Sequence, residues 1–332
     1  MKVVFIGYHC CIRLIKEALA LKEKGNIKVH CIGFKDPAML SAFETYTKCE
    51  TVDHLRKAIM LHSDADIFHV HNEPNWMVNV VHEMSDKPIV LDVHDSMDYR
   101  GSKLTSAAER LAFEIASGFV FVSEPCREIS IRLNPILQDK PNTILHSYVN
   151  RAFYKTRDWA RVGGLVYEGL TSTDESEKYM MYADYRELMN QMDKRGMPFH
   201  IYTTKRNAKW KSYYDKLMSH KTLDYSTLLG NLGHHDWGLC GNITKHKNWN
   251  VAMPNKLFDY IAGGIPIVAI NCKEIETFVV KHDVGISVDS IEELDDRWGE
   301  RAKYQANVFK HRMEFAMENH IHNIEKLYEE VV

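Results

Sequence analysis

One segment places a lysine and an aspartate on the first turns of a predicted helix, a spacing that suits a phosphorylated ligand. Residues 250–269 read NVAMPNKLFDYIAGGIPIVA, in which the proline fits the first helical turn and the paired glycines end the helix. The N–H groups at a helix start attract anions, and Lys256 adds a positive charge there. One turn further on, Asp259 can accept hydrogen bonds from sugar hydroxyls. The segment therefore predicts a phosphate and ribose site, and the alternative is a solvated pair on an ordinary surface helix. The predicted anion-binding residues are Met253, Pro254, Asn255 and Lys256.

Histidines gather where predicted strands of the first half end. The runs DIFHVH (66–71) and PIVLDVH (88–94) each end on a histidine. A neutral imidazole at His94 can hydrogen-bond a sugar hydroxyl or direct the proton of an acceptor hydroxyl. We therefore predict that His94 is catalytic, the alternative being a histidine satisfied by a backbone carbonyl. Further candidate site residues are the polar or small ones after the strand ends, which the family resemblance given below assigns to the acceptor side: Gly7, Tyr8, His71, Asn72, Glu73 and Asp95.

The motif His69-Val70-His71 admits a second interpretation. Residues two apart on a strand share a face, so these imidazoles and Asp92, His94 or Asp95 could ligate zinc in a hydrolase. The chain has 18 histidines, however, so pairs of this kind are expected by chance. We therefore predict no metal and keep a metal hydrolase as an alternative.

These residues need a framework, and the chain predicts a doubly wound α/β fold in each half. Short, continuously apolar runs alternate with helical patterns, which is typical of a parallel sheet covered on both faces. Ligands bind such sheets beyond the carboxyl ends of the strands, where the candidate residues fall. A polar stretch from Asn150 to Arg161 interrupts the rhythm and marks a linker. The predicted strands are 2–7, 27–34, 66–71, 88–94, 118–123, 142–146, 163–167, 198–203, 236–240, 265–270 and 285–288.

The segment PNKLFDYIAGGIPIVA resembles the donor-binding motif PxKxxEYxAxGxPVV of GT-B glycosyltransferases, in particular the retaining family 4 group. Residues 228–239 (LLGNLGHHDWGL) and 163–169 (GGLVYEG) resemble two further elements of that family. The resemblance implies that an acidic residue at the Asp259 position binds the donor ribose. It also implies that the strand-end histidine His94 reaches the reacting sugar.

The same resemblance implies an architecture of two Rossmann-like domains with an interdomain cleft. Residues 1–155 would form the acceptor domain, joined by a C-terminal helix over about 306–332. Residues 156–305 would form the nucleotide-sugar donor domain.

Two positions depart from the family's pattern. Val251 stands where many members have a second glutamate, and Leu170 follows Gly169 where members often have an arginine that holds the diphosphate. Because a leaving nucleoside diphosphate needs its developing charge stabilised, another cation must replace that arginine. Lys256 is the first choice, and a basic pair after the strand 198–203 is the second. The expected donor-binding residues are Gly169, Lys205, Arg206, Met253, Pro254, Asn255, Lys256 and Asp259.

Composition limits the class of protein. The 332 residues are 45% hydrophobic and 26% charged, which is typical of a soluble globular protein. The net charge of -3 gives no global field that would attract nucleic acid or anionic membrane. No targeting segment and no membrane-spanning apolar run is visible. The seven cysteines are an odd number and include no CxxC pair, which favours reduced thiols and a cytoplasmic location. The basic and aromatic stretch Lys205–Lys221 could contact nucleic acid or a membrane surface, although a solvated helix is the favoured interpretation.

Together these patterns predict a metal-independent glycosyltransferase without a cofactor other than its donor. It would move a hexose or pentose from a nucleoside-diphosphate sugar, such as a UDP-sugar, to an acceptor hydroxyl, with retention implied by the resemblance. The acceptor would be a saccharide, a lipid-linked sugar or a hydroxylated base in DNA. The alternatives are a nucleotide-sugar epimerase or hydrolase on the same fold, and a non-catalytic nucleotide-sugar binding protein. Transfer requires an added acceptor, whereas the epimerase and the hydrolase do not.

Overall fold

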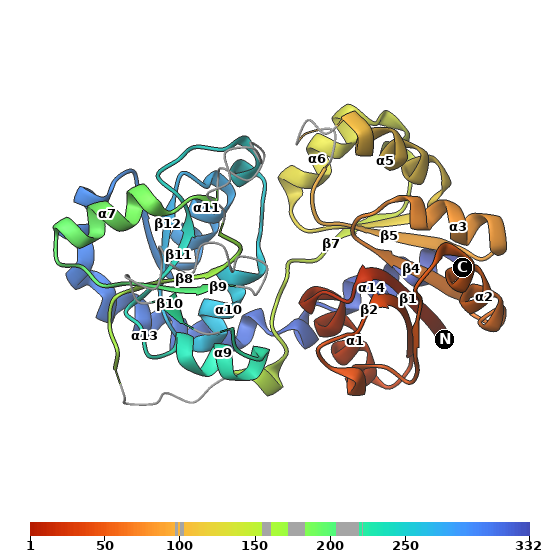
Figure 1. The fold of residues 1–332 in the computed structure, drawn as a ribbon, viewed down its shortest axis with the longest axis horizontal. Helices are drawn as coiled ribbons and strands as arrows, with labels where there is room; N and C mark the ends of the chain where they lie inside the picture. The colour runs from red at the N-terminus through yellow and green to blue at the C-terminus, as the bar shows by residue number, and fades with distance from the viewer. Residues whose placement is uncertain (97–98, 100–102, 155–160, 172–182, 204–218, 221) are drawn as a thin grey trace. The chain divides into compact units, whose positions relative to one another are not determined.

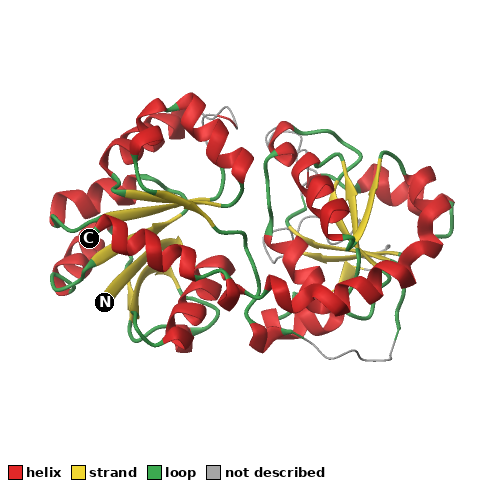
Figure 2. Ribbon diagram, turned by 180° about the vertical axis from the view of Figure 1, so that it is seen from behind, coloured by secondary structure: helices red, strands yellow, loops and turns green. Residues whose placement is uncertain are grey.

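The computed structural model divides the chain into two compact units (Figures 1 and 2). The first comprises Met1–Asn150 and Ala316–Val332, and the second comprises Arg151–Phe315. The described residues are 1–332 without 97–98, 100–102, 155–160, 172–182, 204–218 and 221. The sequence-based boundaries were 155/156 and 305/306. In the structure the second boundary lies later in the chain, between Phe315 and Ala316. Up to Arg312 the chain still belongs to the second unit, because Gln305 and Arg312 donate hydrogen bonds to the backbone carbonyls of Gly264 and Ala262.

The first unit is built on a seven-stranded parallel sheet of order β3-β2-β1-β4-β5-β6-β7. The chain winds from β1 outward to β3, then returns to the other side of β1 as β4, so the winding direction changes between β1 and β4. Helices lie on both faces of the sheet (Figures 1 and 2). The strands are β1 (Lys2–His9), β2 (Lys28–Lys35), β3 (Tyr46–Lys48), β4 (Ile67–His71), β5 (Ile89–Val93), β6 (Gly118–Phe121) and β7 (Asn142–Ile144). The helices are α1 (Ile12–Lys24), α2 (Val52–Leu61), α3 (Trp76–Met84), α5 (Lys103–Ile115), α6 (Glu124–Leu133) and α14 (His322–Val331).

The second unit repeats this plan with a six-stranded parallel sheet of order β10-β9-β8-β11-β12-β13. Its winding direction changes between β8 and β11. The two-residue strand β10, which the sequence pattern did not predict, occupies one edge. The strands are β8 (Leu165–Gly169), β9 (Phe199–Thr203), β10 (Ser219–His220), β11 (Trp237–Gly241), β12 (Ile267–Ile270) and β13 (Gly285–Val288). The helices are α7 (Arg186–Lys194), α9 (Tyr225–Leu232), α10 (Asn255–Gly263), α11 (Lys273–His282), α12 (Ile291–Arg297) and α13 (Arg301–His311).

Apolar strands buried on both faces form the core of each unit. Strands β4, β5 and β6 are buried along their whole length, as are β11 and β12. In the second unit the ring of Tyr260 packs directly on β11, where a Cβ added at Gly238 would come within 2.3 Å of it. These features confirm the predicted α/β class with two doubly wound parallel sheets.

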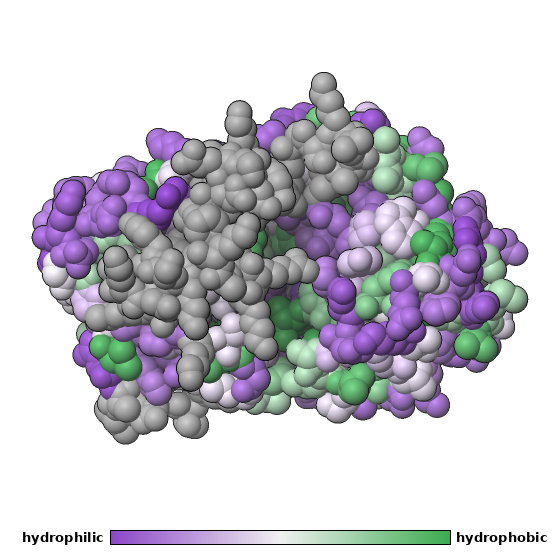
Figure 3. Space-filling model, in the orientation of Figure 1, coloured by the Kyte–Doolittle hydropathy of each residue, from purple (hydrophilic) through white to green (hydrophobic). Residues whose placement is uncertain are grey.

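The outer surface of the first unit is mostly hydrophilic. On the right of Figure 3, apolar residues occur singly among hydrophilic ones. The exposed apolar side chains of this unit include Leu40, Met60 and Leu61, and some exposed apolar residues are normal in soluble proteins. Among the described helices, none is both long and apolar enough to cross a bilayer.

Candidate functional site

The carboxyl ends of β8 and β11 define the first candidate site. Open α/β sheets bind ligands at the carboxyl edge, at the point where the winding direction changes, and these two strands flank that point in the second unit. Strand β8 ends at Gly169, and helix α10 begins after β11. Residues at the end of β8 therefore lie close to residues at the start of α10.

Gly169 and Lys256 lie against each other at this point. The ammonium of Lys256 sits 5.1 Å from the ring centre of Tyr167 and 5.4 Å from that of Trp249, in cation–π contact with both. Gly169 has φ +130, and a Cβ added there would lie 3.6 Å from Lys256 Cε and 3.2 Å from the Tyr167 hydroxyl. The positive φ favours glycine at the end of β8, and a Cβ there would be in ordinary contact with Lys256 Cε. Burial raises the pKa of Tyr167, and the charge of Lys256 opposes that rise.

Helix α10 begins at Asn255, where the sequence pattern predicted its start. Pro254 has φ -73 and ψ 158 and is the N-cap, so that Asn255 is the first helical residue. Met253 is buried beneath this turn, whereas Pro254, Asn255 and Lys256 are partly exposed. Gly264 ends the helix in the left-handed conformation, as predicted. The helix N-terminus, with its partial positive charge, thus lies beside the Lys256 ammonium.

Asp259 lies one turn into α10, and it is held by a residue that sequence reasoning missed. Its side chain is buried, and its Oδ1 accepts a 2.6 Å hydrogen bond from the hydroxyl of Tyr225, the first residue of α9. Burial raises the pKa of Tyr225, and the Asp259 carboxylate raises it further, so the phenol stays protonated and donates. The only sequence signal was an aromatic residue directly after Asp224, the N-cap of α9.

The structure also locates the two positions that depart from the family's pattern. Val251 is buried and Leu170 is partly buried. Lys205 and Arg206 lie outside the described residues, as does most of the basic stretch from 205 to 221. An open pocket near the ends of β11 and β12 carries further lysines that the sequence reasoning did not consider. It is lined by Lys245, His246, Lys247, Asn250, Asn271, Lys273, Glu276 and Asp289.

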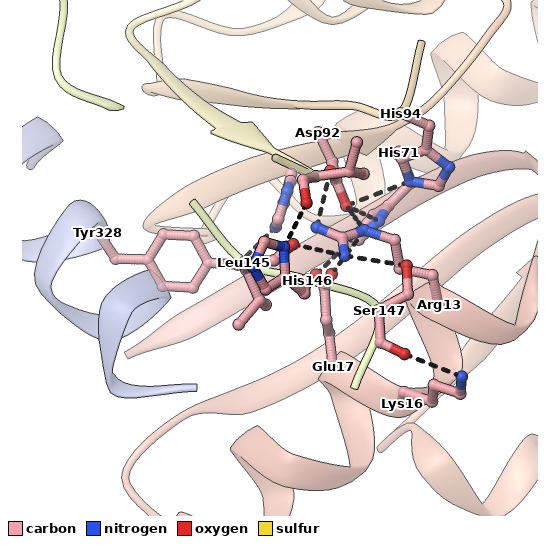
Figure 4. Close-up of polar contacts among 12 residues, drawn as sticks. Arg13, Lys16, Glu17, His71, Asp92, His94, Leu145, His146, Ser147 and Tyr328 are labelled. Atoms are coloured by element: carbon pink, nitrogen blue, oxygen red, sulfur yellow. Dashed lines mark hydrogen bonds and ion pairs between the residues drawn. The ribbon is translucent and has the colours of Figure 1, made fainter. Parts of the chain in front are cut away.

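A buried charge cluster forms the second candidate site, at the carboxyl edge of the first unit (Figure 4). Arg13, on α1, donates from Nε and Nη2 to the two carboxylate oxygens of Asp92 at 2.8 and 3.1 Å. Its Nη1 donates to the carbonyl of Leu145 at 2.8 Å. Both charged side chains are almost completely inaccessible. Paired, bidentate geometry of this kind is what allows two charges to be buried.

Three histidines lie in this cluster: His71 and His94 beside the Asp92 carboxylate, and His69 against His71. His94 Nε2 and His71 Nδ1 each lie 3.3 Å from Asp92 Oδ2 (Figure 4). His69 stacks on His71 at 4.2 Å and shares a 2.7 Å hydrogen bond with the hydroxyl of Tyr328, on α14. His71 and His69 are fully buried, whereas His94 keeps a side-chain exposure of 17%. Of the three, His94 is the one that a ligand can reach.

The charge state of this cluster follows from its burial. Desolvation alone would raise the pKa of Asp92, but Arg13, His94 and His71 together hold it well below its usual range. Burial raises the pKa of Glu17 well above its usual value even though Arg13 opposes the rise. Burial likewise lowers the pKa of His71 to about 4. Arg13 and Asp92 therefore form a buried ion pair, while burial favours the neutral forms of Glu17 and His71.

The metal interpretation of His69 and His71 is also testable against this geometry. Ligand atoms of Glu17, His69, His71 and Asp92 lie within 4.8 Å of one another. The guanidinium of Arg13, however, already contacts both carboxylates, with Nε 3.1 Å from Glu17 Oε1. A second cation at the same carboxylates would meet the repulsion of that buried charge.

The predicted acceptor residues follow strand ends of the same sheet. Gly7 pairs with His71 across β1 and β4, and Tyr8 stacks on Phe34 at 5.1 Å. Asn72 has a left-handed backbone and donates its N–H to the carbonyl of Asp92 at 3.0 Å. Glu73, which follows Asn72, and Asp95, which follows His94, are both partly exposed.

Sequence reasoning missed Arg13, Glu17 and Tyr328. Arg13 and Glu17 are spaced i and i+4 on α1, with Lys16 between them, and charged residues at this spacing are usually solvated. The carbonyl of Ser147 accepts from Lys16, so that three charged residues of one helix are buried. The available signal was their position: Glu17 lies between the buried residues Leu14 and Leu21 on the helix wheel.

Part of the sequence and the whole fold are similar to known proteins. Residues 178–319 match the family "Glucosyltransferase 3-like, C-terminal domain". No curated protein sequence matches the chain. The structure is similar to that of HepE from Anabaena in complex with UDP-glucose, with a TM-score of 0.70 and 12% identity over 100% of this chain and 99% of that one. It is also similar to an α-glucosyltransferase in complex with UDP-glucose and DNA containing an abasic site, with a TM-score of 0.61 and 12% identity over 99% of this chain and 97% of that one. These likenesses show that the chain has the GT-B fold.

Proposed function

We propose that this chain, whose residues 178–319 carry a glucosyltransferase 3-like C-terminal domain, transfers glucose from UDP-glucose to an acceptor hydroxyl. That domain makes it a glycosyltransferase of the hexosyltransferase class, as predicted. UDP-glucose is the donor proposed because two similar structures, HepE and the α-glucosyltransferase, were determined with it. The second unit would hold the donor and the first unit the acceptor.

The contact between Lys256 and Gly169 is the observation that carries this proposal. It joins the end of β8 to the start of α10 at the point where the winding direction changes. A diphosphate placed there would meet a lysine ammonium, a helix N-terminus and a glycine that admits close approach of the backbone. These groups would stabilise the negative charge that develops on the leaving UDP. Lys205 and Arg206 remain proposed as additional cations.

Asp259 would accept hydrogen bonds from the ribose hydroxyls. The hydrogen bond from Tyr225 fixes one of its oxygens and thereby the orientation of the carboxylate. Met253, Pro254 and Asn255 would shape the rest of the donor pocket.

His94 would contact the reacting sugar or the acceptor. Its Nε2 faces Asp92, which is itself held by Arg13, so a buried anion orients the imidazole. Asp92 is a positioning residue in this scheme. The acceptor side would include Gly7, Tyr8, His71, Asn72, Glu73 and Asp95.

The finer properties of the reaction rest on resemblance. Retention of anomeric configuration and independence of a catalytic metal follow the family 4 pattern. A cytoplasmic location is proposed from the odd number of cysteines without a CxxC pair, with membrane association as an alternative. A saccharide, a lipid-linked sugar and a hydroxylated base in DNA are the acceptor classes to be screened. The DNA class is supported by the α-glucosyltransferase whose structure contains DNA.

Calorimetric titration with UDP and UDP-glucose tests the donor site. Lys256→Met should weaken UDP binding about 10-fold to 100-fold, because a hydrogen bond to a charged group contributes about 1.5–3 kcal/mol. The matched control Lys310→Met removes an exposed lysine of α13 and should leave the affinity unchanged. Equal affinity of the wild type and Lys256→Met would remove this lysine from the donor site.

Product analysis separates the alternative functions. Consumption of UDP-glucose only when an acceptor is added supports transfer. Consumption in buffer alone indicates an epimerase or a hydrolase. Tight donor binding without turnover on any acceptor class indicates a non-catalytic nucleotide-sugar binding protein.

A further inference from the structure

Three histidines of the second unit form a cluster away from the donor site. His200 lies on β9, His220 on the edge strand β10, and His235 in the turn before β11. His200 and His235 are buried and His220 is partly buried. Each offers a ring nitrogen, and these three atoms lie within 4.8 Å of one another. No proposed donor residue takes part.

The nitrogens of His200 and His220 already have the separation that two ligands of one metal require. Nδ1 of His200 lies 3.1 Å from Nε2 of His220. Zinc binds imidazole nitrogen at about 2.0–2.1 Å in tetrahedral geometry, which places neighbouring ligand atoms about 3.3 Å apart. The ring of His235 packs 4.4 Å from that of His200, on the same side of the sheet.

The orientation of His235 is fixed from outside the cluster. Its Nδ1 lies 2.9 Å from the carbonyl oxygen of Gly163, which can only accept, so Nδ1 carries the proton. The lone pair is therefore on Nε2, which faces the Tyr202 hydroxyl at 3.3 Å. Histidines that bind metals characteristically donate their second ring nitrogen to a carbonyl or carboxylate in this way.

The charge state of the cluster also suits a metal ion. Burial lowers the pKa of His200 and of His235 to about 4, so both are neutral at pH 7 and carry the lone pairs that ligation needs. The Asp236 carboxylate acts on His200 from nearby and would favour a cation.

We propose that His200, His220 and His235 bind a divalent transition-metal ion, Zn²⁺ by chemistry, which fastens the edge strand β10 to the sheet. Strand β10 has two residues and pairs with β9 alone, so it has few backbone bonds of its own. The ring of His220 stacks on Tyr202 of β9 at 4.2 Å, and a metal would add a bond across the same strand pair. Imidazoles are the ligands that zinc and its neighbours in the first transition row prefer. A solvent molecule would complete the tetrahedron.

The position of the site indicates a structural role. His200 pairs with Val166, three residues before the pair Thr203 and Gly169 at the carboxyl end. Three residues of strand span about 10 Å. The metal would therefore act on the stability of the second unit and leave donor binding to the groups around Lys256.

Metal titration of the full-length chain tests this proposal. After chelation and dialysis, we expect one equivalent of Zn²⁺ to bind and to raise the melting temperature. Cobalt(II) should bind in its place and give the visible absorption bands of tetrahedral nitrogen ligation. The variants His200→Gln, His220→Gln and His235→Gln should each weaken zinc binding on the order of 100-fold or more, since a ligand loss exceeds the 10-fold to 100-fold cost of losing an outer-shell partner.

His54→Gln is the matched control, because it removes an exposed histidine on α2 of the first unit. This variant should keep the wild-type zinc affinity, and UDP affinity should be the same in all variants that fold. His220→Gln protects the test from misfolding, since His220 is the least buried of the three. The proposal is overturned if zinc binding is not saturable at one equivalent, or if His220→Gln binds zinc as the wild type does.

Discussion

Replacing Arg13 by methionine should strongly destabilise the first unit. The guanidinium donates twice to Asp92, at 2.8 and 3.1 Å, and once to the Leu145 carbonyl, and the Asp92 side chain is fully buried. Methionine fills much of the same volume but leaves the carboxylate without its cation. Breaking a buried pair by removing one partner costs about 3–5 kcal/mol. Since domains are stable by about 5–15 kcal/mol, this is a large share of the total.

Glu17→Gln is the matched control from the same helix and the same cluster. Because burial raises the pKa of Glu17 well above its usual value, the protonated carboxyl is favoured, and glutamine is the neutral side chain that resembles it. Below a pH of about 4.3, where the carboxyl is protonated in the folded and the unfolded chain alike, we expect a loss of less than about 1 kcal/mol, the size of a typical hydrogen bond. Above that pH the variant should gain stability relative to the wild type, because glutamine has no proton to retain.

The pH dependence of stability should separate the two carboxyls. For Glu17, the unfolded chain loses its proton above a pKa of about 4.3 while the folded chain retains it, so stability falls by about 1.4 kcal/mol per pH unit above that value until the folded pKa is reached. Glu17→Gln should remove this slope. For Asp92 the folded pKa is depressed, so its stabilisation is present above a pH of about 3.9 and is lost as the pH falls below it.

Hydrogen exchange of the β1 and β5 amides at increasing urea concentration measures the effect, because these strands report on the first unit separately. The ranking expected at pH 7 is Glu17→Gln level with or above the wild type, with Arg13→Met far below both. If Arg13→Met lies within 1 kcal/mol of the wild type, or if Glu17→Gln costs as much, the assignment of charges in the cluster is refuted.

Three further changes test other parts of the structure. His94→Ala should keep the donor affinity but lower the transfer rate about 10²-fold to 10⁴-fold, measured by steady-state kinetics, and full activity would remove His94 from the mechanism. Tyr225→Phe deletes the 2.6 Å hydrogen bond to Asp259 and should weaken UDP binding several-fold by calorimetry, whereas an unchanged affinity would show that Asp259 is not oriented in this way. Gly238→Ala would bring a methyl within 2.3 Å of the Tyr260 ring and should lower the stability of the second unit by about 1–3 kcal/mol or more in urea unfolding; a wild-type midpoint would contradict the close packing there.

Much of the fold could be predicted because its signals are local. An unbroken apolar run such as that of β4 or β11 has to be covered on both faces, which already indicates a parallel sheet. The glycine at the end of α10 and the proline at its start are likewise read from neighbours in sequence. The edge strand β10 was not predicted, because a strand of two residues is too short to show a hydrophobic pattern.

The sequence by itself determined the α/β class, the doubly wound order of the elements and the segment around Lys256 and Asp259, since each depends on residues a few positions apart. Only the tertiary structure decided which distant groups complete the sites. Arg13 meets Asp92 across 79 positions, and Tyr225 meets Asp259 across 34. A charged residue on a helix is normally solvated, so burial of Arg13 and the resulting charge state of its partners appear only when the chain has folded around them.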